Sequence, residues 1–260
     1  MASRTALRGE RQAGASLRHE YEQRRRRFVA NRRRAVWLSA LWWGPAAVLL
    51  GLLGGLSTRY ALFGLLVFVL AVAAVIDVGF RRPNSLERIR QRADAEAGTG
   101  RALHLYQLRG GGRTLHDRVF SGPEAEPFDI EHLVIGPRGI YLIDSKQWHG
   151  FDVRMLGGEL WVDHVNQALT VFPGFKAHAV ALGEALGAAA GGDEEVGVVS
   201  VTPVLAVHAD NLTGTPRQID GVIVMRPEQL PEVLRTADVR WSHSAAEHIA
   251  EAADYLLPSR

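Results

Sequence analysis

The 260-residue chain contains no cysteine and only two lysines among its 30 basic residues. The absence of cysteine excludes disulfide bonds, zinc–thiolate sites and thiol nucleophiles. Because arginine supplies positive charge almost everywhere, the two lysines, Lys146 and Lys176, are unusual. An ammonium group is a compact point charge, whereas a guanidinium group is a planar fork. Either these lysines stand where a compact point charge is needed, or their presence is due to chance.

Acidic residues are scarce at the N-terminus and abundant in the rest of the chain. Residues 1–34 contain eleven arginines and three glutamates, a net charge of +8. Residues 101–260 contain 13 basic and 21 acidic residues, a net charge of −8. The acidic part argues against an extended basic surface for nucleic acid, because phosphate contacts use lysine and arginine. The arginine clusters at the N-terminus favour contact with anionic lipid headgroups.

Two apolar stretches, 36–57 and 60–79, each reach the roughly 20 residues that a helix needs to cross a bilayer. A very short polar turn separates them, and arginine clusters lie on both outer sides, which predicts a transmembrane hairpin with both termini in the cytosol. A soluble helical hairpin is the alternative, but so much apolar sequence is hard to cover in a small domain. We therefore expect a protein of the cell (inner) membrane. It would have a basic, largely disordered cytosolic arm over 1–35, a two-helix hairpin over 36–80 and a cytosolic domain over 84–260.

The pattern of the cytosolic domain predicts an α/β fold with a mixed central sheet flanked by helices. A helix is expected from about Leu86 to Leu108, interrupted near Gly98 and Gly100. Further elements are expected as strands over 114–120, 128–135, 140–147, 151–156, 159–165, 196–208 and 221–225, and as helices over 175–190, 227–234 and 244–257.

The central stretch, 128–150, reads FDIEHLVIGPRGIYLIDSKQWHG. Two apolar runs flank the turn-forming residues 136–139, which predicts a β-hairpin with Ile135 opposite Ile140. The runs are apolar on both faces, which is typical of a strand pair covered on both sides.

Charged side chains lie at the open end of this hairpin. If the register continues, Glu131 falls opposite Asp144 and Asp129 opposite Lys146, and all four share one face. Opposed residues have Cβ atoms roughly 5 Å apart, close enough for two carboxylates to share a hard cation. Burying acids without partners is costly, and a metal together with Lys146 would offset that cost.

The string from Ile130 to Gly150 resembles the core of the nuclease-related domain (NERD) family, which is placed in the PD-(D/E)xK nuclease superfamily. The shared pattern is an acid before a histidine on one strand, a Gly-Pro-x-Gly turn, an acid-x-Lys strand end and a later glycine. The likeness is plausible over about 96–207. The coupling to an N-terminal membrane hairpin also resembles some bacterial members of the family.

The resemblance implies a restriction-endonuclease-like fold and a hydrolase with bound Mg²⁺ or Mn²⁺. It implies that Glu131 and Asp144 bind the metal and that Lys146 is the catalytic lysine. We expect His132, on the opposite face, to be a structural hydrogen-bonding residue, and Asp129 to be an accessory acid or simply solvated. Trp148 is expected either to stack on a base or to pack against the core.

The family pattern also implies an acid after a G-x-x-G stretch of the preceding helix. The matching stretch here is 97–101, so the acid position holds Arg101, and Glu96 is expected to lie on a different face of the helix. Two functions follow from the sequence. One is a membrane-anchored, metal-dependent nuclease acting on DNA or RNA at the cytosolic membrane face, and the other is a catalytically silent binding or sensing module on the same fold.

Overall fold

The structure is a computed structural model that describes residues 13–32, 34, 66, 69, 84–122, 126–191 and 199–259. The chain divides into two compact units, one made of residues 1–18 and 91–260 and the other of residues 19–90. The first long helix, α3 (Asn84–Leu108), begins in the smaller unit and continues into the larger one.

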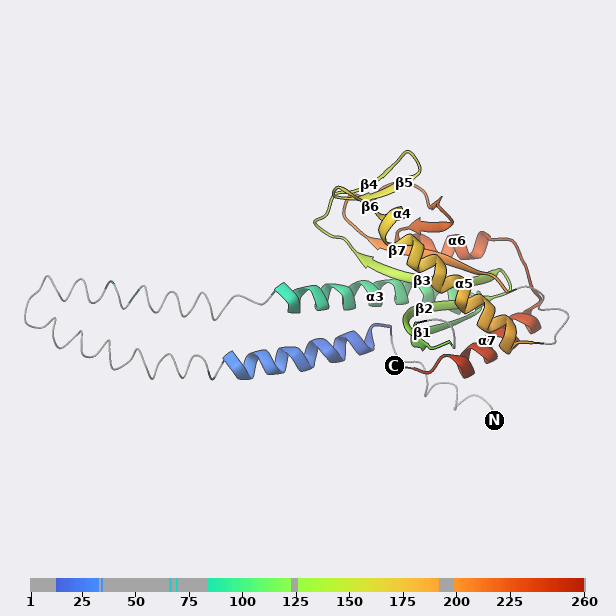
Figure 1. The fold of residues 1–260 in the computed structure, drawn as a ribbon, viewed down its shortest axis with the longest axis horizontal. Helices are drawn as coiled ribbons and strands as arrows, with labels where there is room; N and C mark the ends of the chain where they lie inside the picture. Colours follow the sequence, from blue (N-terminus) through green and yellow to red (C-terminus); the bar gives the residue numbers. More distant parts are fainter. Residues whose placement is uncertain are drawn as a thin grey trace, which may run out of the picture. The chain divides into compact units, whose positions relative to one another are not determined.

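A six-stranded mixed sheet forms the centre of the larger unit (Figure 1). Its order is β1-β2-β3-β7-β9-β8. Strands β1, β2 and β3 pair antiparallel, β7 lies parallel to both β3 and β9, and β8 is antiparallel to β9. The strands are β1 (Arg113–Phe120), β2 (Phe128–Gly136), β3 (Gly139–Gln147), β7 (Val201–His208), β8 (Arg217–Ile219) and β9 (Val222–Met225).

Helices cover both faces of this sheet, so the predicted α/β fold with a mixed sheet is confirmed. Helices α5 (Phe172–Ala189) and α7 (His243–Leu256) pack on one face, in a core cluster that includes Leu133, Ile140 and Leu142. Helices α3 and α6 (Leu230–Thr236) share a second cluster with Val134, Tyr141 and Ile143. The central hairpin is therefore buried on both faces, as its sequence predicts.

The hairpin has the predicted register. Ile135 pairs with Ile140, and the ladder runs from Gly136–Gly139 to His132–Ile143. Gly139 adopts a φ of 146°, a conformation that favours glycine and that closes the turn after Pro137 and Arg138.

A small second sheet follows β3. It has the order β4-β5-β6, formed by β4 (Val153–Leu156), β5 (Glu159–Val162) and β6 (Val165–Asn166), so the strands predicted over 151–156 and 159–165 are present and pair as a hairpin. The chain then returns through α4 (Gln167–Thr170) and α5 to β7. A 3₁₀ turn, η2 (Pro227–Gln229), precedes α6.

The C-terminal residues lie along the outer edge of β1. The backbone N–H of Val119 donates to the carbonyl oxygen of Pro258 at 3.1 Å, and Arg118 and Ser259 form an antiparallel bridge. The Arg118 guanidinium also donates to the carbonyl of Leu257 at 2.8 Å and pairs with Asp254 of α7 at 3.0 Å. These contacts fix the end of α7 beside the first strand of the sheet.

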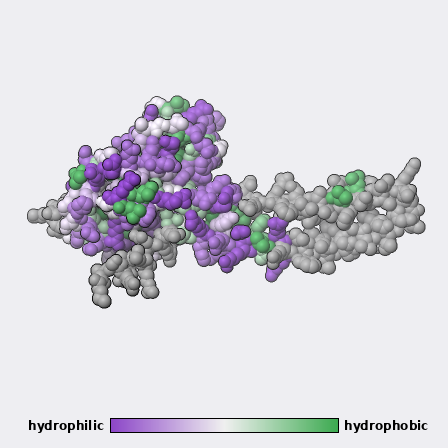
Figure 2. Space-filling model, turned by 180° about the vertical axis from the view of Figure 1, so that it is seen from behind, coloured by the Kyte–Doolittle hydropathy of each residue, from purple (hydrophilic) through white to green (hydrophobic). Residues whose placement is uncertain are grey.

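The predicted membrane hairpin, apart from Leu66 and Val69, lies outside the described residues. Within the part of the chain that the structure describes, no helix is both long and apolar enough to cross a bilayer. Residues 15–32 are helical, although part of this range was expected to be disordered. The face shown in Figure 2 is mostly hydrophilic, with small separate apolar patches. Leu108 and Tyr255 are among the exposed large side chains.

Candidate active site

Helix α3 presents a continuous buried stripe to the sheet. Its members, spaced three or four residues apart, are Glu96, Thr99, Leu103 and Tyr106. Glu96 is only 5% exposed, an unusual position for an acid unless it has a partner. The helix is unbroken through Gly98 and Gly100, so the predicted interruption is wrong and the stripe keeps its phase.

The two glycines allow other parts of the fold to approach α3 closely. A Cβ atom on Gly98 would lie 2.8 Å from Cε1 of His208, and one on Gly100 would lie 2.3 Å from Cβ of Ala13. No real Cβ contact is that short, so both positions require glycine unless the neighbour moves. The glycines thus permit contacts and do not end the helix.

Glu131 reaches β3 through its side chain. Its Oε2 accepts a hydrogen bond of 2.6 Å from the backbone N–H of Ser145, and its Oε1 lies 4.0 Å from the Arg92 guanidinium. Glu131 lies beyond the regular β2–β3 ladder, and the residue of β1 at this level is Asp117, which has a positive φ of 56°. This irregular pairing turns the Glu131 carboxylate towards both α3 and the end of β3.

Asp144 and Lys146 lie near the C-terminal end of β3. Lys146 Nζ is 2.6 Å from Asp144 Oδ2, and the two side chains are 30% and 21% exposed. Both residues pair with β7: Asp144 lies opposite Leu205, and Lys146 lies opposite Val207. The ion pair is therefore held on a strand end that is paired with β7, while its charged groups remain partly accessible.

Several carboxylates of the site lie close together, and few positively charged side chains compensate them. Burial, together with the Asp117 and Asp144 carboxylates and against the opposing effect of Arg92, raises the pKa of Glu96 to about 7. Burial, followed by the Asp144 and Glu96 carboxylates, raises the pKa of Glu131 well above its ordinary value, although the Ser145 N–H and Lys146 counteract this. A cation placed among these carboxylates would relieve both effects.

The donor set suits a hard divalent cation better than a soft one, because it consists of carboxylates with no sulfur and no histidine. Among the residues that the structure describes, no group of three or more metal-binding side chains converges as a ready-made metal cage. Mg²⁺ commonly uses only one or two carboxylates and fills its other positions with water and substrate oxygens. The Glu131–Asp144 pair, with Glu96 behind it, meets that smaller requirement.

Glu96 lies on a different face of the helix from residue 101, as expected, but the site is on the face of Glu96. Its carboxylate interacts with those of Asp144 and Glu131, while Arg101 is exposed. The two positions are five residues apart, about 140° around a helix, so only one of them can face the sheet. That position is Glu96.

The remaining predicted residues lie at the margins of the site. Asp129 is exposed and lies between Phe128 and Ile130, which both pack into the same cluster as Leu133. Asp129 therefore does not share a face with Asp144 and Lys146, because the alternation of β2 slips near Glu131. Trp148 packs against that cluster, and its backbone N–H donates to the carbonyl of His208 at 2.8 Å.

His132 is fully buried and points to the α3 side of the sheet. Burial lowers its pKa well below the ordinary value, and His116 and His208 lower it further. His178 of α5, which sequence analysis assigned no role, stacks on Phe128 with ring centroids 3.9 Å apart. Burial lowers the pKa of His178, and Asp144 opposes this, which places His178 within electrostatic reach of the site.

The N-terminal segment, residues 13–18, also reaches the site. Asp117 is 7% exposed and accepts two hydrogen bonds from Ser16, and a Cβ atom on Gly14 would lie 3.5 Å from Oε2 of Glu96. Sequence reasoning missed Asp117, since no spacing rule connects it with Ser16 across 101 residues. Only its acidic character in a buried strand could have drawn attention to it.

The family described as the nuclease-related domain (NERD) matches residues 91–208. This range contains α3 from Gln91 onwards, strands β1 to β7 and all the residues of the site described above, apart from the N-terminal segment. Comparisons with curated proteins and with solved structures find no match. The larger unit is thus similar to a nuclease-related domain, and its α/β fold is consistent with a nuclease-like one.

Proposed function

We propose that this protein is a metal-dependent phosphodiesterase of the restriction-endonuclease-like type that cleaves DNA or RNA. One observation carries the proposal: Glu96, Glu131, Asp144 and Lys146 interact with one another at one end of the sheet, inside the range that matches the nuclease-related domain. The silent-module alternative depended on the arginine at position 101. Since Glu96 supplies a helix acid, we favour the enzyme.

Each residue has a role that follows from its surroundings. Glu131 and Asp144, with Glu96 as a supporting acid, would hold Mg²⁺ or Mn²⁺. When bound, such an ion polarises the scissile phosphate and lowers the pKa of a bound water. Lys146 is anchored by Asp144 and partly exposed, so its ammonium can donate to a phosphate oxygen and stabilise the negative charge that develops there. The Ser145 N–H holds the Glu131 carboxylate in orientation.

The experiment is a cleavage assay on the purified full-length protein with fluorescent single- and double-stranded DNA and RNA, in Mg²⁺ and Mn²⁺. Lys146→Met is expected to lower kcat by about 10²-fold or more, because a charge-stabilising donor is lost. The matched control is Lys176→Met, which removes the other lysine of the chain, an exposed residue paired with Asp220. Equal cleavage by the two variants, or cleavage that persists in EDTA, would refute the assignment.

A second pair of variants tests which helix residue is the acid. Glu96→Gln is expected to abolish cleavage, whereas Arg101→Glu is expected to leave it unchanged, because residue 101 is exposed. If the native protein is inactive and Arg101→Glu creates activity, the silent-module alternative is correct.

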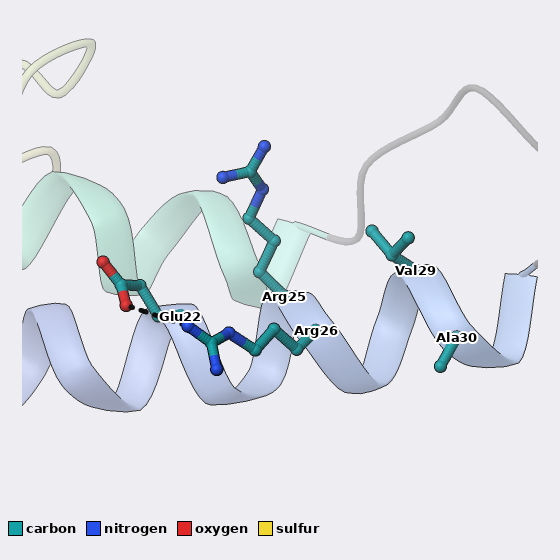
Figure 3. Close-up of a pocket in the computed structure, with 5 residues that line it drawn as sticks. All are labelled: Glu22, Arg25, Arg26, Val29 and Ala30. Atoms are coloured by element: carbon teal, nitrogen blue, oxygen red, sulfur yellow. Dashed lines mark ion pairs between the residues drawn. The ribbon is translucent and has the colours of Figure 1, made fainter.

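For its location, we propose that the apolar stretches 36–57 and 60–79 anchor the protein in the cell membrane and leave the nuclease-like domain in the cytosol. The helix of residues 15–32 supports an accompanying contact with anionic headgroups. It has a hollow lined by Glu22, Arg25, Arg26, Val29 and Ala30 (Figure 3). Arg26 is 3.9 Å from Glu22, whereas Arg25 projects away from that pair. Flotation with vesicles containing phosphatidylserine or only phosphatidylcholine, before and after Arg25→Ala, tests the headgroup contact.

A further inference from the structure

A chain of five polar side chains crosses the interior of the larger unit beside the candidate site. It connects β1, β2, β3, α3 and β7 in four contacts. His116 Nδ1 lies 2.8 Å from His132 Nδ1, and His132 Nε2 lies 3.3 Å from Ser145 Oγ. Ser145 Oγ is 2.9 Å from Thr99 Oγ1, which is 3.0 Å from His208 Nε2. His132 and Thr99 are completely buried, and Ser145 is nearly so.

The hydrogen atoms of these five side chains can be arranged so that each contact has one donor and one acceptor. If the Ser145 hydroxyl donates to Thr99, its oxygen is left to accept from His132 Nε2–H. His132 Nδ1 then accepts from His116, and the Thr99 hydroxyl donates to His208 Nε2. All three histidines are neutral in this arrangement. Among the described residues, no buried side-chain nitrogen or oxygen of these five side chains lacks a partner, which makes such a network rigid.

Ser145 connects these five polar side chains to the acidic residues of the candidate site. Its hydroxyl is held by Thr99 and His132, while its backbone N–H donates the 2.6 Å hydrogen bond to Glu131. The same residue lies between Asp144 and Lys146 on β3. Removing its side-chain partners would free the strand end to shift, and the Glu131 carboxylate would lose its fixed donor.

We propose that Thr99 and His132 are positioning residues that act through Ser145 to orient the Glu131 carboxylate. Both side chains are completely buried, so their effect is on the arrangement of the acids and not on the reacting atoms. The consequence for catalysis depends on the proposed nuclease function, whereas the hydrogen-bond geometry can be tested without it.

The test uses full-length protein labelled with ¹⁵N-serine, without metal or substrate, and the Ser145 signal is assigned by its loss in Ser145→Ala. A short hydrogen bond to a carboxylate is expected to give a strongly downfield amide proton that exchanges slowly. Thr99→Val keeps the shape and removes the hydroxyl, and it is expected to move this proton upfield and accelerate its exchange by about tenfold or more. Thr99→Ser, which keeps the hydroxyl, is expected to retain the native signal.

Thr114→Val is the matched control, because Thr114 is a buried threonine of β1 whose hydroxyl has no hydrogen-bond partner among the described residues. The proposal fails if Thr99→Val and Thr114→Val give the same Ser145 signal. It also fails if the native amide is neither downfield nor protected, a result that requires no folded variant. If the Ser145 signal responds as expected but no variant or native protein cleaves nucleic acid, the positioning role holds and the proposed nuclease function fails. If the positioning role and the nuclease function both hold, Thr99→Val lowers kcat more than it changes KM.

Discussion

Asp117 binds the first turn of the N-terminal helix through Ser16. Its Oδ2 accepts from the Ser16 backbone N–H at 3.0 Å, and its Oδ1 accepts from the Ser16 hydroxyl at 2.7 Å. A carboxylate at this end of a helix satisfies free N–H groups and interacts favourably with the helix dipole. The contact fixes residues 13–18 against the strand and helix that carry the candidate site.

Ser16→Ala is expected to loosen the N-terminal segment, because Asp117 would lose one of its two hydrogen bonds while remaining buried. The loss is expected to be about 1–2 kcal/mol. Limited digestion with trypsin measures the loosening of the segment as faster cleavage after Arg18. The control is Ser242→Ala, which removes the Ser242 cap of α7, whose oxygen accepts from the Ala245 N–H. If the control accelerates cleavage after Arg18 equally, the Ser16 contact is not the cause.

Gly100→Ala is expected to displace the same segment by steric conflict with Ala13. The added methyl group would lie 2.3 Å from the Ala13 Cβ, so the segment must move although alanine favours a helix. Gly187→Ala, in α5, is the matched control, since its methyl group would have ordinary contacts of 3.6 Å or more. Thermal unfolding should show stabilisation of roughly 0.5–1 kcal/mol in the control only. Equal stabilisation of both variants would contradict the tight contact.

Glu96→Gln is expected to change how stability depends on pH. The pKa of Glu96 is raised from 4.5 to about 7, so between these values the native state keeps a proton that the unfolded state has lost. Stability without metal therefore falls as the pH rises through this window. Thermal unfolding in EDTA should show that Glu96→Gln reduces this fall and gains roughly 1–2 kcal/mol at pH 8. Glu251→Gln, at an exposed position of α7, should behave like the native protein.

Binding of Mn²⁺ should have the opposite dependence on pH. Because the metal requires ionised carboxylates, its affinity in the native protein should rise as the pH approaches 7, by up to roughly tenfold per pH unit for each proton released. Calorimetric titration at pH 5.5, 6.5 and 7.5 measures this. Glu96→Gln should bind more weakly at all three pH values. An affinity that does not change with pH would mean that the buried acids do not take part.

Lys146 and Lys176 permit a selective spectroscopic test, because they are the two lysines of the chain. After ¹³C-dimethylation, Asp144→Asn is expected to shift the Lys146 signal alone, since Lys146 Nζ lies 2.6 Å from Asp144. Asp220→Asn should shift the Lys176 signal alone, because that pair has the same 2.6 Å separation on the surface. Addition of Mg²⁺ should then move Lys146 and leave Lys176 in place. Equal movement of both signals would indicate non-specific binding.

The hairpin could be predicted because its signals are local. Two apolar runs around Gly136 and Gly139 determine the turn, and the register follows from it. The pairing of Glu131 could not be continued from that register, because its position depends on β1, where Asp117 adopts a positive φ. Similarly, the short polar strand β8 (Arg217–Ile219) has no pattern of its own and exists because β9 offers it an edge.

The role of Glu96 could not be predicted because the glycines beside it have two possible meanings. Near a helix end, Gly98 and Gly100 usually predict an interruption, which would remove any phase relationship between Glu96 and the sheet. In the fold they face His208 and Ala13, residues distant in sequence, and the helix continues unbroken. The acid of the helix is thus identified by tertiary packing and not by its spacing from the glycines.

The bridge between β1 and the C-terminal residues also bears on solubility. An uncovered outer strand offers a row of N–H and C=O groups to which another molecule can add a strand of its own. Pro258 and Ser259 occupy part of that row on β1, and Arg118 places a charge beside it. Removing Pro258 and Ser259 should therefore promote self-association through this edge. Affinity tags for this protein are better placed where they leave the edge covered.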